Sequence, residues 1–332
     1  MMASGDFEGA WAIFTGLGLY GDSEALASEC LKNTAYNKAV ALMGAERYRD
    51  AVQELEPLAA QGFEDSSNLL TLCRNKIVYN EAVALMMDGR YEDAAIMLEP
   101  LAVQGFEDSS YLVSECGNEI AYAEAVALVR EENYTGAIAL LEPLTAQGFK
   151  DSAALLNECD CNIDYSAADA AYNAGRYYEA YKVFISLGDF KDANRRAGLC
   201  TREYPSTGEV FRDRDYSGTN VALRIETPSD DRRPTFVKIY SEDGVHISSI
   251  FINGGDSPRV RIPAGTYMIR AAYGSDWFGF EDMFGDNGVY QTLLFEGNAT
   301  TIRLQRNHEY TLTLRNAANG NVGTQNGNRG SF

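Results

Sequence analysis

Apolar and polar residues alternate with the period of an α-helix through the first two-thirds of the chain. Apolar residues recur at every fourth position, as in Leu69, Cys73 and Ile77, which predicts a helix with one buried face. The same run returns 43 residues later at Leu112, and again at Leu155. An Asp-Ser pair stands before each run and is predicted to cap the helix by accepting a backbone N–H.

The same residue types recur in register with this period of 43 residues. The registered positions are Tyr36, Tyr79, Tyr122 and Tyr165; Ala39, Ala82, Ala125 and Ala168; and Cys73, Cys116 and Cys159, with Cys30 and Cys200 in the end units. Self-similarity at a fixed period is typical of a repeat protein in which neighbouring units complete one another's core. Five units fit the chain, and the first lacks its opening helix, so an upstream portion, with any targeting signal or anchor, is expected to be missing.

Each unit is predicted to contain a long helix, a tight turn and a shorter helix. Gly89 and Gly175 stand where a left-handed residue would end the long helix. Glu46 and Glu132 occupy the equivalent positions, so they are predicted to turn the chain without glycine.

Two motifs in this unit resemble known helical repeats. The run from Gly89 to Ala94 resembles the G-x-Y-x-x-A core of tetratricopeptide repeats, and Leu101 to Gly105 is similar to the A-x-Q-G end of SEL1-type repeats. The period here is longer than the 34 residues of a tetratricopeptide unit. The resemblance implies an α/α solenoid whose usual work is to bind other proteins, and it implies no catalytic residues.

After residue 218 the apolar period changes to two, which predicts strands. The predicted strands are Val221–Glu226, Thr235–Tyr240, Val245–Ile252, Arg259–Ile262, Tyr267–Tyr273, Val289–Phe295, Thr301–Gln305 and Tyr310–Arg315. Short strands separated by turns are typical of a β-sandwich. The run from Ile262 to Tyr267 looks like the L-P-x-G-x-Y turn of carboxypeptidase-regulatory-like (transthyretin-like) sandwiches. The run from Trp277 to Gly288 resembles a domain of uncharacterised bacterial surface and membrane-linked proteins, and no activity comes with that resemblance.

The predicted architecture is therefore an α/α solenoid of about five 43-residue helical hairpins followed by an antiparallel β-sandwich. The predicted domains are the solenoid at 1–204, a linker or lead strand at 205–218, the sandwich at 219–316 and a flexible Asn/Gly-rich tail at 317–332.

The negative charge is concentrated in the repeats. The net charge is −20, and residues 1–204 hold 33 Asp and Glu against 15 Lys and Arg, whereas residues 205–332 hold 15 against 13. This excess argues against nucleic acid and anionic membrane surfaces as partners, because both need basic side chains. It leaves open a basic protein partner or a surface kept soluble by its charge.

No segment reaches the ~20 apolar residues of a membrane-spanning helix, and no signal peptide opens the chain. Direct membrane insertion is therefore not expected. The compartment stays open between the cytoplasm and an extracytoplasmic or membrane-tethered location that the missing N-terminal portion would provide.

The residues with metal or catalytic potential are few. Five of the six cysteines occupy one repeat-equivalent position each, so they are predicted to be buried thiols rather than disulfides. Cys159 and Cys161 lack the second ligand pair of a structural zinc site. His246 and His308 have no plausible catalytic partner nearby in the sequence. We expect no metal, no cofactor and no enzymatic activity.

The loop between Tyr273 and Tyr290 is the most site-like feature of the second part. Its aromatic side chains could stack on sugar rings or anchor a protein, and its carboxylates could accept hydrogen bonds; alternatively, the aromatics close the sandwich core. A buried Trp277 indole would exclude the sugar-binding version. The candidate binding residues here are Trp277, Phe278, Phe280, Glu281, Asp282 and Asp286.

The repeats supply a second candidate surface in the acids Glu64, Asp65, Glu107 and Asp108. The favoured hypothesis is a non-catalytic scaffold that binds a protein partner through this acidic surface, with the sandwich as a second recognition or docking module. The alternative is a bacterial cell-surface glycan-binding protein that uses the aromatic loop. An enzyme of unrecognised type has the least support.

Overall fold

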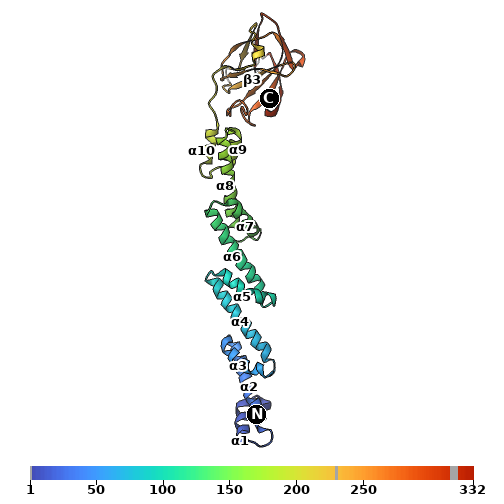
Figure 1. Ribbon diagram of the computed structural model, residues 1–332. Helices are drawn as coiled ribbons and strands as arrows, with labels where there is room; N and C mark the ends of the chain where they lie inside the picture. The colour runs from blue at the N-terminus through green and yellow to red at the C-terminus, as the bar shows by residue number, and fades with distance from the viewer. Residues whose placement is uncertain (1, 229–230, 315–320) are drawn as a thin grey trace. The chain divides into compact units, whose positions relative to one another are not determined.

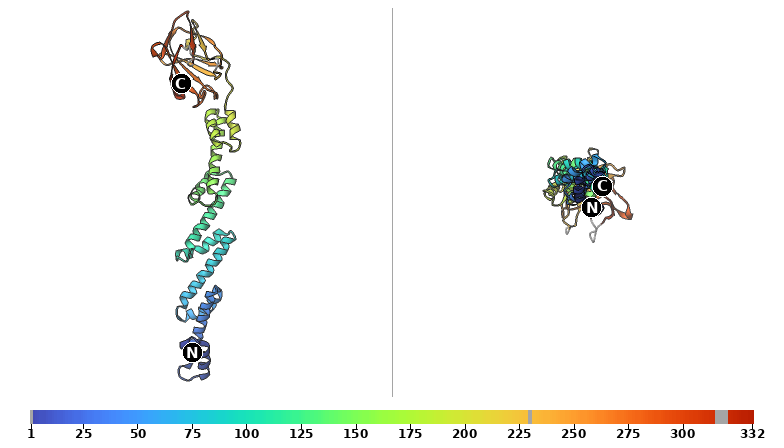
Figure 2. Two further views of the ribbon diagram at one scale, coloured as in Figure 1. Left: turned by 180° about the vertical axis from the view of Figure 1, so that it is seen from behind. Right: turned by 90° about the horizontal axis from the view of Figure 1, so that it is seen from below.

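The computed structural model describes residues 2–228, 231–314 and 321–332. Helices come first and strands second, which confirms the predicted α-then-β organisation (Figures 1 and 2). The chain forms two compact units, residues 1–159 and residues 160–332. The division falls inside helix α8 (Ser152–Asn173), whereas the sequence placed the domain boundary after residue 204. The last helical hairpin therefore belongs to the same unit as the strands.

Long and short helices alternate in the first unit. The long helices have 22 residues and the short ones 11 or 13. Helices α3 and α5 each pack against the long helix on either side (Figure 1). The helices are α1 (Phe7–Leu17), α2 (Ser23–Gly44), α3 (Tyr48–Ala60), α4 (Ser66–Met87), α5 (Tyr91–Val103), α6 (Ser109–Arg130) and α7 (Tyr134–Ala146), and the 3-10 turn η1 (Met2–Ser4) precedes them.

Each central long helix is shared between two successive cores. In α4, Cys73 lies in one core with Ala51 and Leu55 of α3, whereas Ala82 lies in the next core with Leu98 of α5. All five side chains are completely buried. Small Ala and Cys side chains let two helices approach closely, which is why these residue types recur at fixed positions.

The six cysteines form no disulfide, and the five at repeat-equivalent positions are buried, as predicted. Burial raises the pKa of Cys200 to about 11 and also raises the pKa values of Cys73 and Cys116. These thiols stay protonated at neutral pH, which makes them packing residues rather than nucleophiles.

The Asp residues before α4 and α6 do not cap these helices, so that prediction is wrong for both. The Asp65 side chain makes no hydrogen bond to the first turn of α4. Its carboxylate accepts a hydrogen bond from the Tyr36 hydroxyl on α2 instead, and a phenol-to-carboxylate bond is stronger than a neutral one. We call the recurring contacts the Tyr–Asp joints: Tyr36–Asp65, Tyr79–Asp108 and Tyr122–Asp151.

The turns after the long helices follow the sequence prediction. Gly89 ends α4 with a φ of 75°, and Glu46 and Glu132 adopt the same left-handed region with φ values of 57° and 59°. A residue with a Cβ atom is strained in this region. The turns at Glu46 and Glu132 therefore carry backbone strain that the turn at Gly89 avoids.

In its described residues, the second unit contains the second half of α8, two short helices and a sandwich of two sheets. The helices are α9 (Tyr177–Leu187) and α10 (Ala193–Cys200). The strands are β1 (Gly208–Arg212), β2 (Val221–Glu226), β3 (Thr235–Ser241), β4 (His246–Ile252), β5 (Arg259–Ile262), β6 (Gly265–Tyr273), β7 (Val289–Leu294), β8 (Thr301–Leu304), β9 (Glu309–Thr313) and β10 (Gly323–Asn326).

One sheet has the strand order β1-β4-β3-β6-β7-β10, with β8 beside β6, and the other has the order β5-β2-β9. The pairing is antiparallel except between β2 and β9. Both sheets contribute apolar side chains to one core, with Leu223 and Ile262 from the smaller sheet and Ile239 and Ile269 from the larger. The eight predicted strands are present, and β1 lies in the segment predicted as a linker or lead strand.

The larger sheet also has a core on its outer face. Phe236 and Phe251 of the sheet pack there with Trp277, Phe284 and the C-terminal Phe332. The prediction of a flexible tail is wrong for residues 321–332, because β10 pairs with β7 and Phe332 is buried. Residues 317–320 of that predicted tail lie outside the described residues.

Candidate functional site

The aromatic loop of the second unit is mostly buried. Trp277 is 2% exposed and Phe278 5%, whereas Phe280 is 51% exposed. The Trp277 indole packs edge-on against Phe236 and Phe251, with ring centroids 5.5 and 5.0 Å apart. The proposed sugar-stacking platform is therefore wrong for Trp277 and Phe278, because Trp277 covers the outer face of the larger sheet and Phe278 packs against Tyr178 and Tyr181 of α9.

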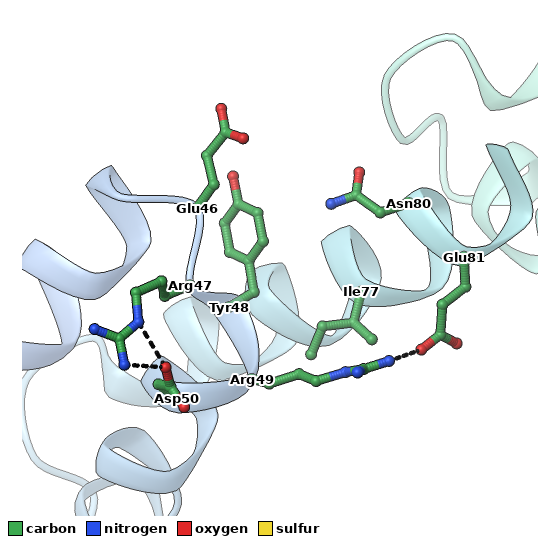
Figure 3. Close-up of a pocket in the computed structure, with 8 residues that line it drawn as sticks. All are labelled: Glu46, Arg47, Tyr48, Arg49, Asp50, Ile77, Asn80 and Glu81. Atoms are coloured by element: carbon green, nitrogen blue, oxygen red, sulfur yellow. Dashed lines mark hydrogen bonds and ion pairs between the residues drawn. The ribbon is translucent and has the colours of Figure 1, made fainter. Parts of the chain in front are cut away.

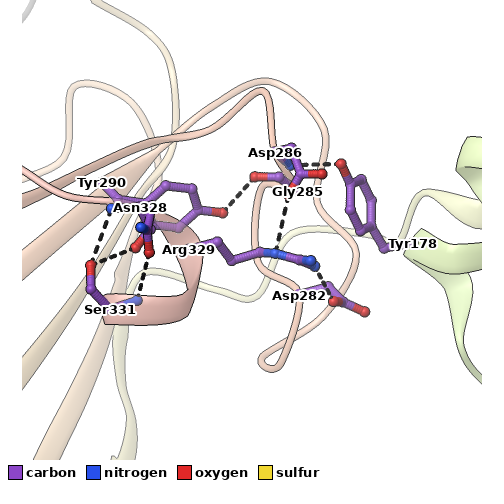
Figure 4. Close-up of polar contacts among 8 residues, drawn as sticks. All are labelled: Tyr178, Asp282, Gly285, Asp286, Tyr290, Asn328, Arg329 and Ser331. Atoms are coloured by element: carbon purple, nitrogen blue, oxygen red, sulfur yellow. Dashed lines mark hydrogen bonds and ion pairs between the residues drawn. The ribbon is translucent and has the colours of Figure 1, made fainter.

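The rest of the loop connects the sheet to the last helical hairpin within the second unit (Figure 4). The Asp286 backbone N–H donates to the Tyr178 hydroxyl of α9 at 2.7 Å. The Arg329 side chain forms ion pairs with Asp282 and with Asp286, and its guanidinium lies 4.6 Å from the Tyr178 ring centroid. These two acids are thus neutralised within the chain. Glu281 is exposed and makes no polar contact within the described ranges.

Three of the four acids predicted in the repeats make contacts between neighbouring units. Asp65 and Asp108 accept the tyrosine hydroxyls of their Tyr–Asp joints. The pKa of Tyr79 is raised to about 12, chiefly by its hydrogen bond to Asp108. Glu107 forms an ion pair with Lys76, and Glu64 holds the same left-handed turn position as Glu107. These acids therefore serve mainly to hold the repeats together. The spacing of 29 residues between each Tyr and its Asp was not recognised in the sequence.

The ion pair beside the joint reverses its polarity between neighbouring repeats. Lys76 of α4 pairs with Glu107, whereas Glu119 of α6, at the position equivalent to Lys76, pairs with Lys150. Both pairs join a long helix to the turn before the next one. The charges are exchanged while the contact is kept.

A shallow groove recurs in consecutive hairpins of the first unit and was not predicted. In the groove of α3 and α4, residues 46–50 at the start of α3 face Ile77, Asn80 and Glu81 of α4 (Figure 3). Its volume is about 280 Å³, just below the usual range for small-molecule sites, so it suits a single side chain of a partner.

The same groove lies one hairpin earlier and one hairpin later. Equivalent residues line the earlier groove, whereas the later one shares only the equivalents of positions 46, 48, 49, 77 and 80 and extends further along α6. The earlier groove is lined by Gly5, Asp6, Phe7, Glu8, Thr34, Asn37 and Lys38, and the later one by Gly89, Tyr91, Glu92, Glu119, Ile120, Tyr122, Ala123, Val126, Arg130 and Lys150.

The charged residues at equivalent positions beside the groove change from hairpin to hairpin. In the α3–α4 groove, the Arg49 guanidinium spans the groove to Glu81, and a dashed line marks this pair in Figure 3. In the α5–α6 hairpin the equivalent positions hold Glu92, which lines the groove, and Glu124, which is exposed but is not among the lining residues. A bridging pair is thereby replaced by two carboxylates. The lining also includes Arg130 and the Glu119–Lys150 ion pair.

The surroundings of the α5–α6 groove strengthen this difference. Residues 31–87 hold 7 Asp and Glu against 6 Lys and Arg, whereas residues 88–142 hold 12 against 2. The two cations in this range are Arg90, which pairs with Asp93, and Arg130, which lines the groove. Lys150, just beyond the range, also lines the groove and pairs with Glu119. Residues 1–30 hold 5 Asp and Glu and no Lys or Arg, so the acidity assigned to all repeats is concentrated in the first hairpin and around α5, α6 and α7.

The arrangement nearest to catalytic chemistry lies on the larger sheet. A bulge in β4 brings His246 and Ser249 to the same face, with Nε2 and Oγ 2.8 Å apart. Lys238 of β3 pairs in register with Ser249, and burial with the nearby Arg270 lowers the pKa of Lys238. The Ser249 side chain is 2% exposed, so a substrate has no access to this hydroxyl.

Among the described residues, none of the helices is long and apolar enough to cross a membrane, and His, Cys, Asp and Glu do not gather in groups of three that could hold a metal ion. Comparison with family models, with curated proteins and with solved structures found no match to this chain. The functional assignment therefore depends on the geometry of the chain itself.

Proposed function

We propose that this chain is a non-catalytic scaffold that binds a protein partner through basic side chains, and that the groove between α5 and α6 receives one of them. The observation that carries the proposal is the replacement of the Arg49–Glu81 pair by Glu92 and Glu124. A partner's guanidinium would take the place that Arg49 occupies one hairpin earlier.

The resemblance of the repeats to tetratricopeptide and SEL1-type units supports this class of function, since such solenoids usually bind proteins. The sandwich, similar to carboxypeptidase-regulatory-like modules, would serve as a second docking domain. The glycan-binding alternative loses its support, because it required an exposed Trp277 indole.

The expected strength of a single contact is small. An exposed ion pair contributes about 0.2–1 kcal/mol, and salt screens it. Useful affinity therefore requires several basic residues along the stretch of excess charge between residues 88 and 142. A basic segment of the partner, rather than one isolated Arg, fits this requirement.

The test uses a nine-residue oligoarginine peptide and the matching oligocitrulline peptide, which is neutral but has nearly the same shape. Titration calorimetry at low and high salt gives the affinity, and amide NMR shifts locate the site. We expect the arginine peptide to bind at α5 and α6, to weaken with salt, and to lose its preference over citrulline when salt is high.

Two variants with the same change in net charge separate a site from bulk charge. Glu92→Arg should form an internal pair with Glu124, as Arg49 does with Glu81, and lower the affinity about tenfold. Glu99→Arg changes the same helix outside the groove and should lower it less than about threefold. Equal losses in both variants would reject the groove, and equal binding of the citrulline peptide would reject the electrostatic basis.

A further inference from the structure

The outward side of α5 carries two large apolar side chains that are exposed to solvent. Ile96 is 68% exposed and Val103 is 89% exposed. They are seven residues apart, so they project from the same side of the helix, about 10 Å apart along its axis. Glu92 and Glu99 project from this side as well, because they lie four residues before Ile96 and Val103, and both are exposed. We call these four residues the α5 face.

The neighbouring short helices have smaller or polar residues at the two apolar positions. The counterparts of Ile96 are Gln53 in α3 and Ala139 in α7, and those of Val103 are Ala60 and Ala146. All of these counterparts are exposed as well, so the packing of the helices does not call for an apolar residue at either position. The α5 face therefore differs from its counterparts in chemistry and not in burial, which indicates a role outside the fold of the unit.

The distance between Ile96 and Val103 selects the form of the segment that can cover both. Side chains on one side of an α-helix recur every seven residues, so a helix laid along α5 presents apolar residues at the same interval of about 10 Å. In an extended segment, side chains on one side are about 7 or 13 Å apart, and neither interval matches. An amphipathic helix is therefore the occupant that fits the α5 face.

The charge around the α5 face selects the composition of this helix. Residues 88–142 hold 12 Asp and Glu against 2 Lys and Arg, so a partner with basic side chains is attracted and an acidic one is repelled. A second copy of the chain carries the same acids, with a net charge of −20, and is disfavoured as an occupant. Glu92 lies in the first turn of α5. A helix that runs antiparallel to α5 brings its last turn there, where its own dipole favours basic residues.

We infer that the α5 face binds an amphipathic helix of a basic partner protein, antiparallel to α5. Two apolar residues of this helix, seven positions apart, cover Ile96 and Val103, and basic residues in its last turn lie beside Glu92. The inference rests on the proposed function, since Glu92 also lines the α5–α6 groove. It goes further because it assigns to the partner segment a helical form and an apolar side, which the groove alone does not require.

The probe is a capped 18-residue peptide of alanine and glutamine, with leucine at positions 4 and 11 and arginine at positions 15 and 18. The first arginine follows the second leucine by four residues, as Glu92 precedes Ile96 by four. A control peptide keeps the arginines but has glutamine, which forms helices nearly as well, in place of both leucines. Titration calorimetry with the full chain at low salt gives both affinities. We expect the leucine peptide to bind about tenfold more tightly than the control peptide, because it removes apolar surface from water.

Two variants of the chain test whether the α5 face is the place of binding. Ile96→Gln with Val103→Ala gives α5 the residues that α3 has at these positions, so the fold is retained. It should reduce the affinity of the leucine peptide to that of the control peptide. Leu19→Gln removes an apolar side chain that is 90% exposed in another hairpin and should change neither affinity by more than about twofold. Equal losses in the two variants would overturn the assignment to α5.

The failure of this inference and the failure of the proposed function give different results. Equal, salt-sensitive affinities of the two peptides for the native chain would overturn the apolar contact and leave the proposed function intact. Binding that salt does not weaken would overturn both, since the basic character of the partner would then play no part.

Two further outcomes would assign the α5 face to another occupant. Self-association of the chain that Ile96→Gln with Val103→Ala abolishes would show that a second copy covers the face. Binding of neutral phosphatidylcholine vesicles that the same variant abolishes would show that a lipid surface covers it. Either result would overturn the inference.

The direction of the partner helix is tested by a spin label at the last residue of the leucine peptide. In the antiparallel arrangement the label lies near the first turn of α5 and should broaden the amide NMR signals around Glu92. Broadening around Val103 instead would contradict this arrangement.

Discussion

Removing one hydroxyl from a Tyr–Asp joint should measurably weaken the first unit. In Tyr79→Phe the ring keeps its edge-on contact with Phe106, at 6.2 Å between centroids, but the hydrogen bond of 2.6 Å to Asp108 is lost. The change therefore isolates the bond from the packing.

The magnitude follows from the raised pKa of Tyr79, about 12 against an ordinary value of 10.0. Each unit of pKa corresponds to about 1.4 kcal/mol, which sets a nominal upper value of about 2.7 kcal/mol. The joint is exposed to solvent, so screening reduces this to about 1 kcal/mol. We expect a fall in the melting temperature of the first unit of about 3 °C.

The pH dependence has a defined sign. A raised pKa means that the folded state favours the neutral phenol, so the stabilisation is complete below pH 10 and is lost as the pH rises towards about 12. The difference in melting temperature between the native chain and Tyr79→Phe should therefore be constant from pH 7 to 9. It should fall to about half at pH 11.

Thermal denaturation followed by circular dichroism at 222 nm measures this effect across the pH range. Tyr91→Phe is the matched control, because the Tyr91 hydroxyl makes no hydrogen bond in the parts of the chain that the structure describes. A loss in Tyr79→Phe no larger than in Tyr91→Phe, or a difference that grows above pH 10, would refute the reasoning.

Two further pairs of substitutions test the backbone and the packing. Glu132→Gly should raise the stability of the first unit by about 1 kcal/mol, because glycine adopts the left-handed turn without strain, and Gly89→Glu should lower it by a similar amount. Thermal denaturation measures both changes. A loss of stability in Glu132→Gly would contradict the backbone strain at this turn. Gly285→Ala would place a Cβ atom 2.3 Å from the Tyr178 ring, so it should destabilise the second unit by about 2 kcal/mol in urea denaturation. In a Tyr178→Ala background, Gly285→Ala should lower the free energy of unfolding by less. An unchanged urea midpoint in Gly285→Ala would contradict the contact.

Periodic patterns predicted the fold well because they are imposed by burial. The strands β2 and β5 have the predicted bounds, and the registered alanines, such as Ala82, are core residues. The tail was misjudged because its Asn and Gly residues lack apolar side chains. An edge strand such as β10 needs only backbone hydrogen bonds to pair, which composition does not reveal.

The candidate sites were harder to predict because polar side chains choose among partners in three dimensions. Asp65 stands correctly for a helix cap, yet the Tyr36 hydroxyl competes successfully for its carboxylate. Trp277 belongs to a loop whose sequence suits a binding surface, but the outer face of the larger sheet requires a cover. The difference between the grooves was detectable in the sequence, because the repeat register pairs position 49 with position 92 and position 81 with position 124.

The reversed ion pairs beside the joints have a consequence for folding. Tandem repeats of similar sequence can fold with a unit docked on the wrong neighbour. If the turn of Lys150 docked on α4, it would face Lys76, and if the turn of Glu107 docked on α6, it would face Glu119. Like charges would then oppose each other in both mispaired arrangements. Because the charges are exchanged, each turn forms a favourable ion pair only with its own helix, which disfavours misassembly. The exchange adds nothing to the contacts of the correctly folded chain.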